Sequence, residues 1–192
     1  MTDIIDMPLS RRLKTSTGGT HDRLDTRIMA ADPFASYGRF LMVQYAFHRD
    51  IAPVYDHAPL AALIPDLVER NRLARIGQDM ADLGLAIPPV DGPSPFAEGV
   101  RDMSAALGWL YVAEGSNLGA AFLFKGAAAL GLNGDHGARH LAGHADGRAR
   151  HWRGFTDALD GLRLSDAETQ QVEDGARAAF LRVHGLVDRH FA

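Results

Sequence analysis

The stretch from 104 to 130 constrains the fold most, because it contains no proline and its pattern predicts one long helix. Four of its glycines, Gly108, Gly115, Gly119 and Gly126, are spaced by 7, 4 and 7 residues. This spacing places them at nearly the same angle on a helix with 3.6 residues per turn. Each glycine costs a helix about 0.5–1 kcal/mol relative to alanine. Two reasons for the row stay open: close packing of another helix, or close approach of a flat ligand.

Length and composition predict one domain. The chain has 192 residues, 46% of them hydrophobic, which is enough for a sizeable core. Its net charge of −4 and pI of about 6.1 argue against general nucleic-acid binding. We find neither an apolar run of membrane-spanning length nor a secretory signal, so we expect a cytoplasmic protein with no membrane contact.

Cysteine is absent, and this excludes several chemistries. No disulfide, thiolate nucleophile, cysteine-ligated metal or covalent haem attachment can form. A metal or haem would have to be held by nitrogen or oxygen, and nine histidines are present.

The periodicity predicts an all-α architecture of roughly seven or eight helices. Residues 1–10 read as a flexible lead-in, and 11–192 as one domain. Pro33 and Pro53 are expected to end the first two helices, and Ser165 with Glu168 forms a capping box. The expected helices span 11–31 (or a shorter helix from His21 capped by Thr20), 34–51, 60–83, 96 or 101 to 130, 148–162 and 165–190, with 84–95 a loop and 131–147 unassigned.

Lys14 and His21 form the first candidate constellation. They lie on one helix face, about 10 Å apart along its axis. A neutral imidazole can bind haem iron, and an ammonium two turns away can pair with a propionate. The alternative is a hydrogen-bonded core histidine and a solvated lysine. Asp22 and Asp25 read as a solvated face, with Asp25 also able to orient a neighbouring group.

Two segments resemble a known family. LKTSTGGTHDRLD (13–25) resembles the proximal helix of haem oxygenases, and LYVAEGSNLGAAFL (110–123) resembles the distal helix of the bacterial members. YGRFLMVQYAFH (37–48) and LAGHADGRARHWRGF (141–155) are also similar to bacterial biliverdin-forming enzymes, including those that serve bacteriophytochromes. The resemblance covers about 11–190. It implies the haem oxygenase fold and cleavage of haem, both substrate and cofactor, to biliverdin, CO and Fe²⁺ with O2 and external electrons.

The resemblance also implies partners for the reaction and a role for each candidate residue. Ferredoxin or an NADPH-dependent reductase is expected to donate electrons, and a bacteriophytochrome is one candidate acceptor of the product. Mammalian-type members carry an aspartate where this chain has Ser116. The implied roles are iron ligation by His21; close approach of the distal backbone at Gly115 and Gly119; distal water at Ser116; propionate contact by Lys14 and Tyr111; a proximal-helix contact with the cofactor at Thr17; and a pocket wall at Phe180. Arg153 is a further candidate for a propionate, without a clear match in the family pattern.

Other functions stay open on sequence alone. One is a haem carrier or sensor without turnover, which would use the same pocket. Another is a small-molecule enzyme of the related thiaminase-like architecture, which requires no axial histidine. His48 is a rival proximal ligand, but we expect it to be a core or surface histidine.

A histidine row and a basic region add two weaker signals. His136, His140 and His144 recur every four residues and would bind zinc or nickel on a rigid helix, but flanking glycines favour an exposed turn. Four arginines follow or interleave with this row, and we expect them to meet an acidic redox partner. They are Arg139, Arg148, Arg150 and Arg153.

Overall fold

The structure is a computed structural model that describes residues 7–89 and 92–191, and every regular element in these ranges is helical. The predicted all-α class is confirmed, with seven α-helices and two short 3-10 helices in the described ranges. They are α1 (Leu9–Ala30), α2 (Tyr37–Tyr55), α3 (Ala58–Ala61), η2 (Val68–Arg70), α4 (Leu73–Asp82), α5 (Met103–Ala129), η3 (Arg139–Leu141), α6 (Arg148–Asp160) and α7 (Asp166–His190).

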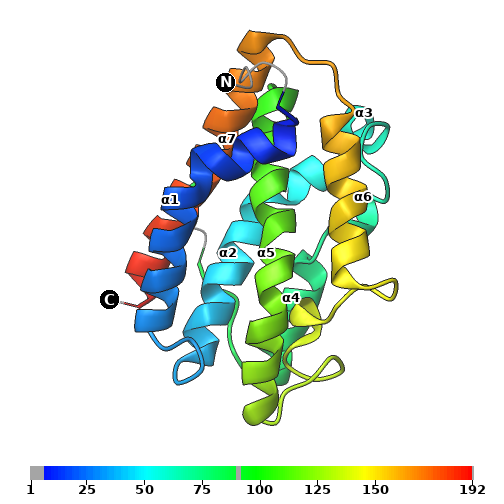
Figure 1. The fold of residues 1–192 in the computed structure, drawn as a ribbon. Helices are drawn as coiled ribbons and strands as arrows, with labels where there is room; N and C mark the ends of the chain where they lie inside the picture. The colour runs from blue at the N-terminus through cyan, green and yellow to red at the C-terminus, as the bar shows by residue number, and fades with distance from the viewer. Residues whose placement is uncertain (1–6, 90–91, 192) are drawn as a thin grey trace.

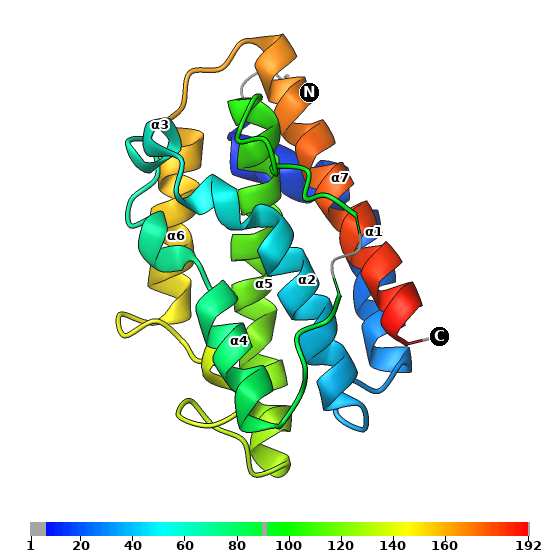
Figure 2. The ribbon, with the colours of Figure 1, turned by 180° about the vertical axis from the view of Figure 1, so that it is seen from behind.

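The long helix α5 runs through the middle of the molecule (Figure 1). It packs against α7, α6 and α2, while α1 packs against α7 and α6. Seen from behind, α2 and α4 lie over the opposite face of α5 (Figure 2). The helix begins at Asp102, whose carboxylate accepts a hydrogen bond from the backbone N–H of Ala105 at 3.0 Å. This N-cap satisfies a donor that the helix itself leaves free.

One glycine of the predicted row lies where α5 crosses α7. A Cβ built on Gly108 would lie 2.1 Å from the carbonyl oxygen of Val172. A Cβ on Gly175 of α7 would lie 2.2 Å from the carbonyl oxygen of Ala105. The two backbones are therefore in direct contact, and only glycine fits at either position. Close helix packing, one of the two reasons left open, explains this end of the row.

Two helix boundaries differ from the sequence prediction. Pro53 lies inside the last turn of α2, which ends at Tyr55, so proline does not end the helix there. The single helix expected over 60–83 is wrong, because α3, η2 and α4 are separate. Pro65 disfavours helix at the residue before it, and Asp66 adopts a left-handed φ of 58°, which a continuous α-helix does not contain.

The helix ends at both termini of the domain follow from local signals. Helix α1 continues through Gly18 and Gly19 to Ala30, so the shorter helix capped by Thr20 is wrong. Ser165 and Glu168 form the predicted capping box of α7. The lead-in predicted for 1–10 lies mostly outside the described residues, and α1 already begins at Leu9. Among the described residues, no helix is long and apolar enough to cross a bilayer.

Candidate functional site

His21 projects from α1 with its side chain 55% exposed. Its ring meets the edge of Phe180 from α7, with centroids 6.0 Å apart and planes at 76°. Its Nδ1 lies 3.3 Å from Oδ2 of Asp25, one turn later on the same helix. A carboxylate at Nδ1 can orient the ring and leave Nε2 available to a metal. The sequence placed Asp25 on a solvated face; it is exposed, and it also contacts His21.

Two neighbours of His21 on α1 differ in their exposure. Thr17 is buried, and its hydroxyl donates to the carbonyl oxygen of Leu13 at 2.7 Å, so the hydroxyl is used within the helix. Lys14 is exposed two turns before His21, as the spacing predicts. The structure therefore places Lys14 and His21 on one accessible side, with Thr17 in the packing against the rest of the fold.

The C-terminal half of α5 has an open glycine face. A Cβ on Gly119 would meet no atom within 4 Å, and one on Gly115 would meet only the Trp152 ring at 3.6 Å. Ser116 is exposed, and its hydroxyl donates to the carbonyl oxygen of Ala113 at 2.7 Å. In Figure 1 no helix lies in front of this half of α5, between α1 and α6. Packing therefore does not account for Gly119.

Large apolar side chains surround this open face. Leu118 is 44% exposed and Phe122 is 59% exposed. Phe34 packs edge-on against Phe122, with centroids 6.1 Å apart, and covers Gly126, where a Cβ would lie 2.1 Å from the Phe34 ring. Exposed large apolar side chains beside an open backbone are typical of a ligand or partner site. The row thus divides into packing at Gly108 and Gly126 and open surface at Gly119.

Tyr111 stands one helical turn before Gly115 on the same side of α5. It is half-buried, with its ring 5.6 Å from that of Trp152. Burial, and then the charge of Asp160, raise the pKa of Tyr111 to about 12. Its phenol therefore keeps its proton at neutral pH and can act as a hydrogen-bond donor.

The opposite side of α5 carries a buried charge network that sequence reasoning missed. Oε2 of Glu114 lies 2.9 Å from Nη1 of Arg70, and both side chains are 2% exposed. The Tyr55 hydroxyl donates to Oε1 of Glu114 at 3.2 Å. Arg70 also donates through Nε to the Pro65 carbonyl oxygen at 2.9 Å. Glu114 immediately precedes Gly115, so the network fixes the turn of α5 that carries the open face. Glu114 lies in the EGS motif of the segment 110–123, and a charged residue in this apolar helix was the sequence signal that could have indicated the network.

Some buried polar atoms near α5 have no hydrogen-bond partner in the described structure. They are Nδ1 of His48 and both amide atoms of Asn117. Burial, and then the charges of Arg72 and His140, hold the pKa of His48 well below its usual range. His48 is therefore a neutral core histidine, which is one of the two places, core or surface, that the sequence analysis left open. Buried polar atoms without a partner in the chain are usually satisfied by ordered water or a ligand.

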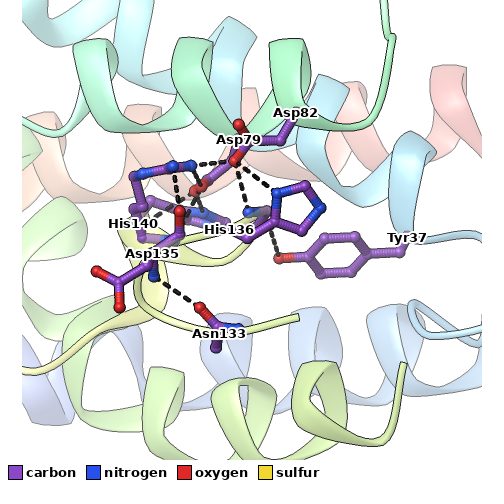
Figure 3. A network of polar contacts seen from close by, with 9 residues as sticks. Tyr37, Asp79, Asp82, Asn133, Asp135, His136 and His140 are labelled. Atoms are coloured by element: carbon purple, nitrogen blue, oxygen red, sulfur yellow. Dashed lines mark hydrogen bonds and ion pairs between the residues drawn. The ribbon is translucent and has the colours of Figure 1, made fainter. Parts of the chain in front are cut away.

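The histidine row between 131 and 147 does not share a helix face. His140 is buried, with Nδ1 2.7 Å from Oδ2 of Asp79, and its Nε2 has no partner in the described structure. His136 is half-exposed, with its Nδ1 3.6 Å from Oδ2 of Asp82 (Figure 3). His144 stacks on His151 instead, with centroids 4.4 Å apart. In the described residues, no three histidines or carboxylates gather as a metal site.

Two arginines of the predicted basic region already have partners within the protein. Arg139 pairs with Asp79 and Asp82. Arg148 donates to the carbonyl oxygens of Asn117 and Leu141. Only the remaining two arginines, Arg150 and Arg153, are exposed on α6. The surface offered to an acidic partner is therefore smaller than the sequence implied.

Comparison with known proteins identifies the family. A model of the family described as heme oxygenase matches residues 96–189. The chain is 44% identical over 186 residues to the heme oxygenase PigA of Pseudomonas aeruginosa, covering 95% of this chain and 93% of that protein. The chain belongs to the haem oxygenase family. This confirms the resemblance that the proximal and distal segments indicated.

The fold agrees with solved haem oxygenases. The NO- and CO-bound heme oxygenase from Neisseria meningitidis superposes with a TM-score of 0.90 at 41% identity, covering 96% of this chain and 92% of that one. The heme oxygenase from Leptospira interrogans superposes with a TM-score of 0.77 at 19% identity, covering 95% and 100%, and supports the fold alone. The described helices therefore form a haem oxygenase fold.

Proposed function

We propose that this haem oxygenase family member cleaves haem oxidatively to biliverdin, CO and Fe²⁺, with O2 and electrons from an external donor. The observation that carries the proposal is the pairing of an exposed, carboxylate-oriented histidine on α1 with an open glycine face on α5. The names of the relatives point to the same chemistry. Haem, when bound, supplies the iron for O2 activation and is also the substrate.

His21 holds the iron through Nε2 in this proposal. The Asp25 carboxylate, 3.3 Å from the other ring nitrogen, favours this ring orientation. The edge of Phe180 limits rotation of the imidazole and walls the pocket. A neutral imidazole suits this activity, because a thiolate ligand would favour O–O cleavage, and the chain has no cysteine.

The distal face is formed by backbone at Gly115 and Gly119. Without a Cβ at Gly119, a flat ring can approach the helix and leave space for O2. Leu118 and Phe122 provide apolar contact at the exposed margin. Ser116 presents hydroxyl lone pairs beside this face while its proton is directed to the Ala113 carbonyl. Its Oγ would hold distal water when haem is bound.

Lys14 and Tyr111 contact the propionates in this proposal. Lys14 contributes a charge about 10 Å from His21 along α1. Tyr111 contributes a phenol that stays protonated at neutral pH. Arg153 is exposed on α6 and remains a third candidate, whereas Thr17 supports the site through packing.

Electron delivery and product transfer are also part of the proposal. Ferredoxin or an NADPH-dependent reductase donates the electrons, and the exposed Arg150 and Arg153 offer positive charge to an acidic donor. A bacteriophytochrome is one candidate acceptor of the bilin. The cytoplasmic location expected from the sequence stays part of this proposal.

The test is turnover of the purified chain loaded with an equimolar amount of haem. Ascorbate, or ferredoxin with its reductase and NADPH, is added in air while the visible spectrum is recorded. We expect decay of the Soret band, a broad band toward the red, release of CO and an extractable bilin, whose isomer reports the meso carbon cleaved. A Soret band that persists with both donors would contradict turnover and support the carrier alternative.

A further inference from the structure

A hollow lies on the side of α5 that faces away from the proposed haem face. It has a volume of about 80 Å³ and is lined from η2, α4, α5 and α6, and from the segment before α6. On a 3.6-residue helix, Asn117 of this hollow points nearly opposite to Gly115 and Gly119. The hollow is therefore separate from the site proposed above.

The lining of this hollow carries more positive than negative charge. Arg70, Arg72, Arg75 and Arg148 line it, against one carboxylate, Glu69. Glu114 neutralises Arg70. Arg148 donates only to carbonyl oxygens, which leave its charge uncompensated.

Two of these arginines have no polar partner. Within the described ranges, neither the Arg72 nor the Arg75 side chain makes a hydrogen bond or ion pair. Burial lowers the pKa of Arg72, and the charge of Glu114 opposes this shift only in part. Like charges that converge in a partly enclosed space repel one another unless an anion lies between them.

An unpartnered amide supplies the second observation. Asn117 is 5% exposed, and neither its Nδ2 nor its Oδ1 has a hydrogen-bond partner in the described structure. Asn117 is one of the residues that line the hollow. The backbone N–H of Asp146 donates to Nδ1 of His144 at 3.1 Å, so the neutral His144 ring carries its proton on Nε2 and can donate. Donors from α5 and from the segment before α6 thus accompany the unpaired charges.

We propose that this hollow binds a small oxyanion of the phosphate class, held by Arg72, Arg75 and the Asn117 amide. Its volume admits one tetrahedral oxyanion or a few waters. Water would fill the space but would leave the arginine charges facing one another. A doubly charged oxyanion compensates them and offers acceptors to several donors at once.

A histidine that lines the hollow, His151, is also surrounded by cationic groups. Burial, and then the neighbouring Arg70, His144 and Arg72, lower the pKa of His151 to about 4. An anion in the hollow would favour the protonated imidazole and raise this pKa. His151 therefore gives a local spectroscopic readout of occupancy that does not depend on haem.

The test is calorimetric titration of the purified full-length chain with inorganic phosphate, at constant ionic strength set by chloride, without and with bound haem. NMR of the His151 ring follows its titration in parallel. We expect saturable phosphate binding in both states, a raised His151 pKa and a higher melting temperature. Phosphate that binds no better than chloride and leaves the His151 titration unchanged would overturn the proposal. Because the test includes the haem-free chain, its result is separable from loss of turnover.

Matched variants localise the binding. R75Q removes an exposed arginine of the hollow, R72Q a partly buried one, and R150Q an exposed arginine of α6 that does not line it. Loss of one charged donor is expected to weaken phosphate binding about tenfold. R75Q and R72Q should show this loss, and R150Q should match wild type. Equal affinity in all three variants would contradict the assignment.

Phenyl phosphate serves as a second ligand. If it binds as tightly as phosphate, the oxyanion arrives as part of a larger ester. If only phosphate binds, the free ion is the occupant. Failure of both contradicts the proposal.

Discussion

Glu114 and Arg70 form an ion pair of 2.9 Å in which both side chains are 2% exposed. Glu114 stands one residue before Gly115, and Arg70 ends η2. The pair therefore ties the turn of α5 that begins the proposed distal face to the irregular segment before α4. Tyr55 completes the arrangement through its hydroxyl, and burial, followed by the charge of Glu114, raises the pKa of Tyr55 well above its usual value.

The first prediction concerns this pair. Glu114→Gln should lower the free energy of unfolding by about 3 kcal/mol, because it leaves the Arg70 charge buried without compensation. Glu98→Gln is the control, since Glu98 pairs with Arg101 at the surface and its loss should cost less than about 1 kcal/mol. Urea unfolding measures both. Equal stabilities of the two variants would show that the buried pair does not hold the fold.

Gly108→Ala tests the packed end of the glycine row. Its Cβ would lie 2.1 Å from a backbone oxygen of α7, so the helices must separate. We expect a loss of about 3 kcal/mol in the free energy of unfolding, since overpacking against backbone cannot be relieved by a rotamer change. Thermal and urea unfolding measure it. A variant as stable as wild type would contradict the crossing geometry.

Gly119→Ala tests the open end of the same row. Its Cβ meets no atom, so the helix should gain about 0.5–1 kcal/mol in the free energy of unfolding. The methyl group would nevertheless stand where haem is proposed to approach. Bilin formation should slow by about ten- to a hundredfold, because displacement of a substrate by about 1 Å costs up to that much. A variant that is more stable and fully active would exclude Gly119 from the distal face.

The contrast between these glycines shows what sequence could and could not predict. Spacing placed Gly108 and Gly119 on one face, but it could not say which half α7 covers, because that depends on contacts between residues far apart in the chain. Likewise, helix periodicity joined 60 to 83, whereas the left-handed backbone at Asp66 divides it. The capping box at Ser165 needed only neighbours three residues apart and was predicted correctly.

The candidate site divides in the same way. The family resemblance marked His21 and Gly119, whose roles rest on short motifs. It gave no account of Asn117 or of the arginines behind α5, because they converge from four helices, η2, α4, α5 and α6, and have no shared spacing. The histidine row was predicted in part. The glycines among 131–147 favoured turns over a metal-binding helix, and the chain there does form turns and a short 3-10 helix. The burial of His140 against Asp79 was not predicted, because it depends on a contact with a distant part of the chain.

His21→Ala tests the proposed iron ligand. The side chain is mostly exposed, so the free energy of unfolding should change by less than about 0.5 kcal/mol. Haem affinity should fall and the Soret band should move, because the iron loses its nitrogen ligand. Equimolar haem titration compares the variant with wild type and with His136→Ala, whose imidazole is half-exposed at Asp82. A wild-type Soret position and affinity in His21→Ala would contradict the assignment.

The stability of the protein should fall as the pH is lowered below about 6.5. Burial, and then Arg72 and His140, hold the pKa of His48 well below that of the unfolded chain. The unfolded state therefore binds a proton that the folded state excludes, so this contribution is complete above pH 6.5 and is lost toward the folded pKa. One such group gives a slope of at most about 1.4 kcal/mol per pH unit.

Urea unfolding at about pH 7.5, 6.5 and 5.5 measures the slope. His48→Gln should lower stability at neutral pH and make the slope shallower, since an amide does not titrate. A slope in His48→Gln as steep as in wild type would show that other groups, such as the buried His140, account for the acid sensitivity.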